Sequence, residues 1–215
     1  MEPTKKTKVK RAPKRGFYDR ETIYKILDNH FICQVAFVHE GYPVIIPTIF
    51  GRDKDNLYIH GATISRMLVE LEKGFPMSLN VTQTDGIVLA RSAFHHSLNY
   101  QSVTIFGEAE LVTNDDERYR ALEIISDQII PERWAEVRLP NAKEMKVTKI
   151  LRISITEASA KIRNGPPSDD KPDYELPIWA GVVPINTSFG TPIADLVLDD
   201  KIPFPESVKT LLKNE

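Results

Sequence analysis

The sequence predicts a mainly β protein, an antiparallel barrel with flanking helices. At least six strand-like runs follow one another along the 215 residues, and short connections join most of them. Only two or three helical patterns are long enough to be substantial. Glycines with the spacing G-x-G-x-x-G, which open a dinucleotide-binding βαβ unit, do not occur, so a doubly wound parallel sheet has little support.

Strands are recognised by alternating or continuous apolar residues between turn-forming residues. They are predicted over residues 31–39, 42–50, 57–60, 77–84, 86–91, 99–112, 148–156 and 158–163, with a short apolar piece at 178–185. Glu40-Gly41 and Asp85-Gly86 are each expected to form the tight turn of a hairpin, because both dipeptides end in a glycine that tolerates positive φ.

Proline and glycine interrupt two of these strands. Pro43 and Pro47 lack the N–H that a central strand uses, so the strand at 42–50 is expected to be irregular or to lie at a sheet edge. Gly107 is expected to mark a bulge in the strand at 99–112.

Helices are predicted where apolar residues recur at helical spacing after a capping residue. They are expected over residues 19–29, 65–73, 115–130, in two pieces over 132–145, and over 205–213. Asp19 and Asn114 are the expected N-caps of the first and third helices, and Gly74 is expected to end the second. Pro140 separates the two pieces of the fourth.

The chain is expected to have three parts, the first of which is marked by its charge. Residues 1–16 carry seven of the 28 lysines and arginines, although the net charge is −2, and we expect them to form a flexible basic arm. Residues 17–186 are expected to form the barrel, and residues 187–215 a C-terminal extension whose short helix packs on it. Because the chain without its arm is acidic, nucleic-acid binding is not expected of the protein as a whole.

Composition also gives an expected compartment. The sequence contains no apolar run of about 18 residues and no apolar segment after Met1, so we expect neither a membrane span nor a secretory signal. Cys33 is the only cysteine, which excludes an intramolecular disulfide, and its apolar surroundings suggest an inert core thiol. Together these features favour a cytoplasmic protein.

The segment from Leu57 to Met67 carries the clearest chemical signal. A strand ends at His60-Gly61, and Ser65 and Arg66 stand at the start of the next helix. A hydroxyl, a guanidinium and free backbone N–H groups at one helix start suit a phosphate. The plainer interpretation is an N-cap serine beside a surface arginine.

Four segments, in this order, carry a resemblance to a known family. They are residues 15–27; residues 41–48 with 57–61 and Ser65-Arg66; residues 90–103 running on to 106–107; and residues 161–167 with 179–184. Together they resemble the FMN-binding split β-barrel flavoproteins related to pyridoxamine 5′-phosphate oxidase, in the branch that includes nitroimidazole-reductase-like proteins. The resemblance spans roughly residues 15–186.

The resemblance implies a split barrel that binds FMN as a homodimer, with two flavin sites at the subunit interface. It assigns the flavin ring to the strand of Ile46, Pro47, Thr48 and Ile49, and the ring or ribityl chain to Ile59 and His60. It assigns the phosphate to Ser65 and Arg66, the far side of the flavin to Gln101 and Ser102, and a position near the flavin to Trp179.

Two departures limit the activity that the resemblance implies. The branch usually has arginine where this chain has Gln101, so one positive contact is missing or replaced. No arginine motif follows Trp179, which argues against pyridoxamine phosphate oxidase activity. His60 is alternatively a polar strand end and Trp179 a core residue. His95 and His96 would point to opposite faces of a strand, so no metal site is expected there.

The function expected from these features is an FMN-dependent oxidoreductase acting on a small molecule, possible acceptors being nitro or quinone compounds. The electrons would come from a nicotinamide donor, NADH or NADPH, or from another reductant. No side chain is identified as an acid–base catalyst, because the cofactor carries the redox chemistry. The alternative is a non-catalytic flavin- or haem-binding storage or sensor protein. A nucleic-acid binder that uses its basic arm is the weakest interpretation.

Overall fold

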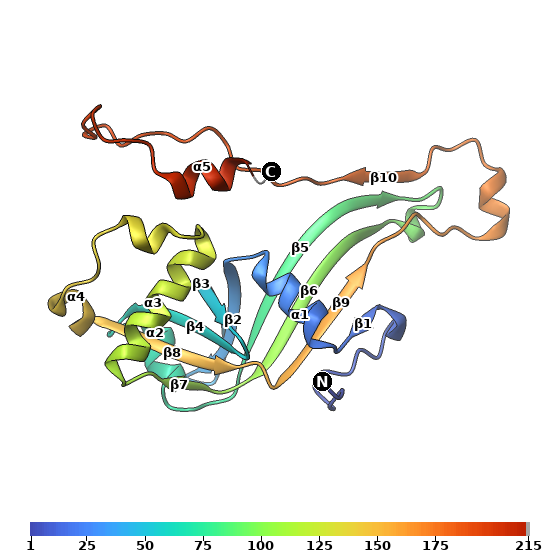
Figure 1. Ribbon diagram of the computed structural model, residues 1–215. Coiled ribbons are helices and arrows are strands. Elements are labelled where there is room, and N and C mark those ends of the chain that lie inside the picture. The colour runs from blue at the N-terminus through green and yellow to red at the C-terminus, as the bar shows by residue number, and fades with distance from the viewer. Residues whose placement is uncertain (214–215) are drawn as a thin grey trace.

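The computed structural model describes residues 1–213, and it confirms a mainly antiparallel β fold with flanking helices (Figure 1). The strands are β1 (Gly16–Phe17), β2 (Ile32–His39), β3 (Tyr42–Asp53), β4 (Asn56–Ala62), β5 (Met77–Leu89), β6 (Ser97–Gly107), β7 (Ala109–Leu111), β8 (Thr148–Ser154), β9 (Glu157–Arg163) and β10 (Gly181–Pro184). Residues 214–215, the end of the predicted extension, lie outside the described residues.

All strand pairs are antiparallel, in the order β1-β9-β6-β5-β2-β3-β4-β8-β7, and β10 pairs with β5. The chain passes from β6 directly into β7, which lies at the other end of this order beside β8. The sheet therefore curls back on itself as a split barrel around a main apolar core, and a second, smaller apolar cluster lies between α3 and the sheet.

The helices lie at the ends and on one side of this barrel. They are α1 (Arg20–Asp28), α2 (Arg66–Leu71), α3 (Asp115–Ile129), α4 (Ala142–Lys146) and α5 (Glu206–Lys213), with 3-10 turns η1 (Pro13–Arg15), η2 (Ala93–His95), η3 (Arg133–Glu136) and η4 (Lys171–Glu175). The apolar faces of α1 and α2 enter the main core, and α3 packs on β3 and β4. Burial of such aliphatic side chains stabilises the fold by about 1.5–3 kcal/mol each.

Local sequence signals placed several boundaries correctly. The Asp19 side chain accepts from Thr22 N–H at 2.7 Å, and Asn114 accepts from Glu117 N–H at 2.9 Å, as expected of N-caps. Glu40 and Gly41 have φ values of 50° and 82°, which confirms the tight turn between β2 and β3.

The hairpin predicted at Asp85-Gly86 is wrong. β5 runs straight through this dipeptide, and only a register shift between Thr84 and Gly86 marks it. The physical reason for the glycine is β10: a Cβ on Gly86 would lie 3.0 Å from Cγ1 of Val182 and 3.1 Å from the Val183 carbonyl. Gly86 therefore allows a third strand to approach closely and does not turn the chain.

The single strand predicted at 99–112 is also wrong. β6 ends at Gly107 and β7 begins at Ala109, and the two strands have different partners. The expected bulge at Gly107 is the point at which the chain crosses from the β5 side of the barrel to β8. Apolar alternation continues through this crossing because both strands face the same core.

Both terminal segments contact the rest of the chain. In the basic segment, Lys6 pairs with Glu157 at 2.8 Å, and Val9 N–H donates to the Tyr18 hydroxyl at 2.8 Å. At the other end, α5 meets η3 through Ser207, which donates to Glu136.

Within residues 1–213, no helix is both long enough and apolar enough to cross a bilayer.

Gly51 fixes how closely α3 lies on β3. A Cβ at this position would lie 2.7 Å from the backbone of Ile125, and backbone atoms cannot move aside cheaply. We expect Gly51→Ala to lower the free energy of unfolding by about 1–3 kcal/mol in urea denaturation. Gly165→Ala is the matched control, because a Cβ there meets nothing within 4 Å. Equal stabilities of the two variants would contradict this account of the helix–sheet contact.

Candidate flavin site at the split between β3 and β4

A split opens between β3 and β4 beyond the pair Phe50–Ile59. β3 pairs with β2 upstream of this point, but with β4 only from Phe50 to Asp53. Phe50 N–H donates to the Phe31 carbonyl at 3.0 Å. In an antiparallel pair, residues that bond to the partner alternate with residues whose peptide groups point away. The odd-numbered residues of β3 therefore turn their peptide groups toward the open side.

Pro43, Ile45, Pro47 and Ile49 form this open edge. Both prolines lack an N–H, so Ile45 and Ile49 supply the N–H donors along it. The side chains of Pro47 and Ile49 are exposed. The expectation that this strand lies at an edge is thus confirmed for the stretch upstream of Phe50. A molecule laid along the edge would meet two amide donors, several carbonyls and an apolar surface.

His60 stands on the opposite side of the split, one residue beyond the last β4 residue that pairs with β3. The other edge of β4 pairs with β8 from Asn56 to Ala62. Its Nδ1 is buried and has no hydrogen-bond partner among residues 1–213. Burial lowers the pKa of the imidazole, so His60 is neutral at pH 7. An unpaired buried polar atom costs about 1–3 kcal/mol, and native proteins keep few of them. His60 Nδ1 therefore marks a place where a bound molecule would complete a hydrogen bond.

Ser65 and Arg66 follow at the start of α2. Ser65 occupies the N-cap position, but its side chain makes no capping hydrogen bond. Arg66 is exposed and forms no ion pair within the described part of the chain. Gly61 brings α2 close to β4, because a Cβ there would lie 3.1 Å from Cδ1 of Leu68. Ser65 is thus the N-cap by position and Arg66 lies at the surface, and both side chains are available to a ligand.

Three other predicted residues of this region face inward to different degrees. Ile59 is fully buried in the core, so its side chain is out of reach of a ligand. Ile46 is partly buried and packs against the core, and Thr48 is partly buried next to Cys33, whose thiol lies 3.6 Å from the Thr48 carbonyl. The peptide groups of Ile46 and Thr48 point toward β2, so these two residues support the open edge and do not supply its free groups.

Gln101, Ser102 and Trp179 lie elsewhere in the molecule. Gln101 and Ser102 are on β6, and three strands, β5, β2 and β3, separate β6 from β4 in the sheet. The Gln101 side chain donates to Asp85 at 3.2 Å, and the Ser102 hydroxyl donates to the Lys161 carbonyl at 3.4 Å. Trp179 precedes β10, is 66% exposed and packs its ring against Gly181, so it is not a core residue. One copy of the chain does not bring these residues to the split.

The prediction that His95 and His96 lie on a strand is wrong. His95 ends the turn η2 and His96 follows it, so neither lies on the expected strand face. His96 accepts from Ala90 N–H at 3.2 Å, and the ligand atoms of His95, Asp170 and Asp173 lie within 4.8 Å of one another. Local pattern could not reveal this group, because the loop that carries both carboxylates is far away in the sequence.

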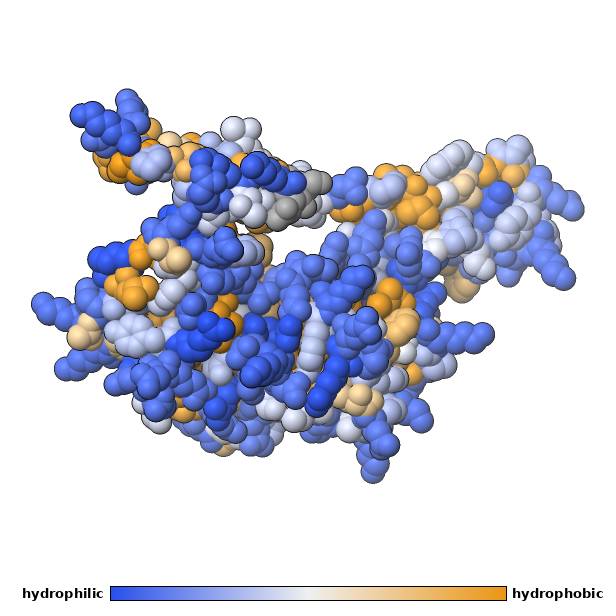
Figure 2. Space-filling view, viewed as in Figure 1, coloured by the Kyte–Doolittle hydropathy of each residue, from blue (hydrophilic) through white to orange (hydrophobic). Residues whose placement is uncertain are grey.

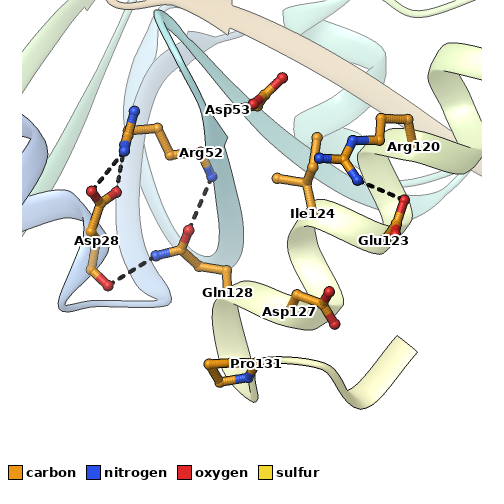
Figure 3. Close-up of a pocket in the computed structure, with 9 residues that line it drawn as sticks. All are labelled: Asp28, Arg52, Asp53, Arg120, Glu123, Ile124, Asp127, Gln128 and Pro131. Atoms are coloured by element: carbon orange, nitrogen blue, oxygen red, sulfur yellow. Dashed lines mark hydrogen bonds and ion pairs between the residues drawn. The ribbon is translucent and has the colours of Figure 1, made fainter. Parts of the chain in front are cut away.

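Figure 3 shows a charged hollow of about 300 Å³ between α1, β3 and α3. Its polar groups bond to one another: Arg52 pairs with Asp28, and Arg120 with Glu123 at 2.8 Å. Gln128 donates to the carbonyls of Leu27, Asp28 and His30. These contacts clamp the two helices onto the sheet, and none of the predicted site residues lines the hollow.

A comparison with known families agrees with the fold. The family model described as pyridoxamine 5′-phosphate oxidase matches residues 19–162, more than half of the chain. The chain belongs to this family. The resemblance found in the sequence is thereby confirmed at the family level. Comparison with curated protein sequences gave no match.

Two solved structures are similar to this chain over nearly its whole length. The flavocytochrome Anf3 from Azotobacter vinelandii is 37% identical with a TM-score of 0.92, over 97% of each chain. The FAD and heme binding protein from Mycobacterium smegmatis is 38% identical with a TM-score of 0.88, over 92% of this chain and 97% of that one.

A third structure shows the fold alone. The putative 5-nitroimidazole antibiotic resistance protein from Bacteroides thetaiotaomicron is 20% identical with a TM-score of 0.53, over 68% of this chain and 86% of that one.

The lowered pKa of His60 predicts a pH dependence of stability. The unfolded chain takes up the proton near the ordinary pKa of 6.5, whereas the folded chain does so only at lower pH. Acidification below about pH 6.5 therefore favours the unfolded state through this group. We expect His60→Gln to lose less unfolding free energy than the wild type between pH 7.5 and pH 5, measured in urea. Equal acid sensitivity in both proteins would contradict the burial of a neutral imidazole.

Proposed function

We propose that this protein binds a flavin at the split between β3 and β4 and acts as an oxidoreductase on a small molecule. The observation that carries the proposal is the buried, unpartnered Nδ1 of His60 beside the open edge of β3. The strand Ile46–Ile49 would hold the ring through the outward-facing peptide groups of Pro47 and Ile49, and His60 would complete a hydrogen bond to the flavin. Ser65 and Arg66 would hold its phosphate.

The flavin is proposed to be FAD, whose FMN half places the same phosphate at Ser65 and Arg66. The sequence pointed to FMN. FAD is favoured because a structure that covers nearly the whole of this chain is described as an FAD and heme binding protein. A haem as second cofactor has the same support, together with the flavocytochrome. When bound, the flavin supplies reversible electron transfer, and the protein supplies binding, orientation and access.

The working unit is proposed to be a homodimer. Gln101, Ser102 and Trp179 lie several strands away from the split in one copy. A second copy would bring its own versions of these side chains to the flavin, and the exposed ring of Trp179 would gain buried area and stacking there. The exposed apolar residues of β2 and β3, which include Ile32, Ile45 and Ile49, provide a surface for such an interface.

The first test uses the purified protein. We expect a flavin absorption spectrum, release of FAD on denaturation as judged by mass spectrometry, and a Soret band from haem. Reduction by NADH or NADPH followed by reoxidation with a quinone or nitro compound would support the enzyme. Release of FMN would overturn the choice of FAD, and failure to retain or take up any flavin would overturn the site. A flavin that does not turn over would leave a storage or sensor protein.

The second test concerns the phosphate. We expect Arg66→Ala to weaken flavin binding at least tenfold, since a charge-assisted hydrogen bond contributes about 1.5–3 kcal/mol and 1.4 kcal/mol corresponds to tenfold. Titration of the apoprotein followed by flavin fluorescence measures the dissociation constant. Arg120→Ala is the matched control, because it removes an exposed arginine at the charged hollow of Figure 3. Equal effects would contradict the assignment of the phosphate to α2.

A further inference from the structure

The chain does not return to the barrel directly after β10. β10 pairs with β5 from Gly181 to Pro184, and the chain meets the body again at Ser207, whose N–H donates to Glu136 at 3.1 Å. In Figure 1 the segment between these anchors runs across the molecule as a separate layer. We call residues 191–204 the C-terminal arm.

The arm keeps its own shape. Val197 N–H donates to the Asp195 carboxylate at 3.0 Å, and Lys201 N–H donates to the Asp199 carboxylate at 2.9 Å. The backbone of Leu198 and Ile202 closes the same two turns. Within the described chain, the hydrogen bonds of the arm all run inside the arm. The barrel therefore does not hold it in place between its anchors.

The arm exposes several apolar side chains of its own. Ile193 is 97% exposed, Leu196 102% and Val197 89%. Ile202 and Phe204 are about half exposed. Figure 2 shows apolar side chains along this layer and an open gap between part of it and the body. Contiguous exposed apolar residues on a folded protein mark an interaction surface.

We propose that the C-terminal arm clasps a second copy of this chain. The inference rests on the homodimer proposed above and adds the segment that holds it together. The arm follows β10 and Trp179 in the chain. In the proposed homodimer, this part of the chain must reach the flavin site of the partner. It therefore extends an interface on the same side of the molecule.

The number of exposed residues on this surface is of the order that a dimer interface needs. A stable interface takes about 20–30 residues from each partner. The arm, together with the exposed apolar residues of β2 and β3 and the segment around Trp179, is a set of that order. A two-fold axis would place each arm on the other copy, so that one contact covers these apolar surfaces on both chains.

The first experiment measures the dimer dissociation constant by sedimentation equilibrium. We expect the triple variant Ile193→Asp, Leu196→Asp, Val197→Asp to raise it at least tenfold. These side chains are exposed in a single copy, so the fold should survive, and circular dichroism checks this. The double variant Leu139→Asp, Val147→Asp, on exposed residues next to α4, is the control and should leave the constant unchanged.

Two results would overturn the inference in different ways. A wild-type protein that is monomeric at every concentration would remove the proposed homodimer and the clasp together. A dimer that the triple variant leaves intact would remove the clasp alone and leave the homodimer standing.

A second experiment identifies what the arm touches. A photoreactive benzoylphenylalanine in place of Leu196 should, on irradiation, give a covalent product of dimer mass on a denaturing gel. The same probe in place of Val147 is the control and should give none. A product of monomer mass that links the arm to its own barrel would overturn the proposal.

Discussion

The hydrogen-bond pattern of β3 is the constraint on which the rest of the site depends. Its even-numbered residues bond to β2 along the strand, and its odd-numbered residues bond to β4 only from Gly51 onward. β4 pairs with β8 along its other edge from Asn56 to Ala62, but its pairing with β3 ends at Ile59. The odd-numbered residues upstream of Phe50 are left without a strand beside their peptide groups. Unpaired backbone groups need water or a ligand, so the split is a consequence of strand pairing.

Close packing holds the two walls of this split in position. Gly51 lets the backbone of α3 lie against β3, and Gly61 lets α2 lie against β4. Larger residues would push the helices away from the sheet, and at position 61 this would move Ser65 and Arg66, at the start of α2, relative to His60 on β4. The geometry of the site therefore depends on residues that touch no ligand, and precise placement of this kind is typical of sites built on rigid elements.

The features that could be predicted from the sequence are those set by residues close together in the chain. Asp19 and Asn114 identified two helix starts, because a cap bonds within its own turn. Asp85-Gly86 misled the prediction, because the glycine serves a contact with β10 from nearly a hundred residues away. Ser65 and Arg66 could be found from neighbouring residues. Gln101 and Trp179 came only from the family resemblance, and the carboxylates near His95 were missed because loop proximity has no local signal.

Pro43 and Pro47 have a further consequence for the molecule in solution. An open strand edge is a template on which a strand of another molecule can add, and this kind of β-augmentation leads to aggregation. Along the open side of β3, two prolines remove every second amide donor, so an incoming strand would find an incomplete ladder. A small planar ligand needs only one or two donors and is still accommodated. The same edge is thus open to a cofactor and closed to aggregation.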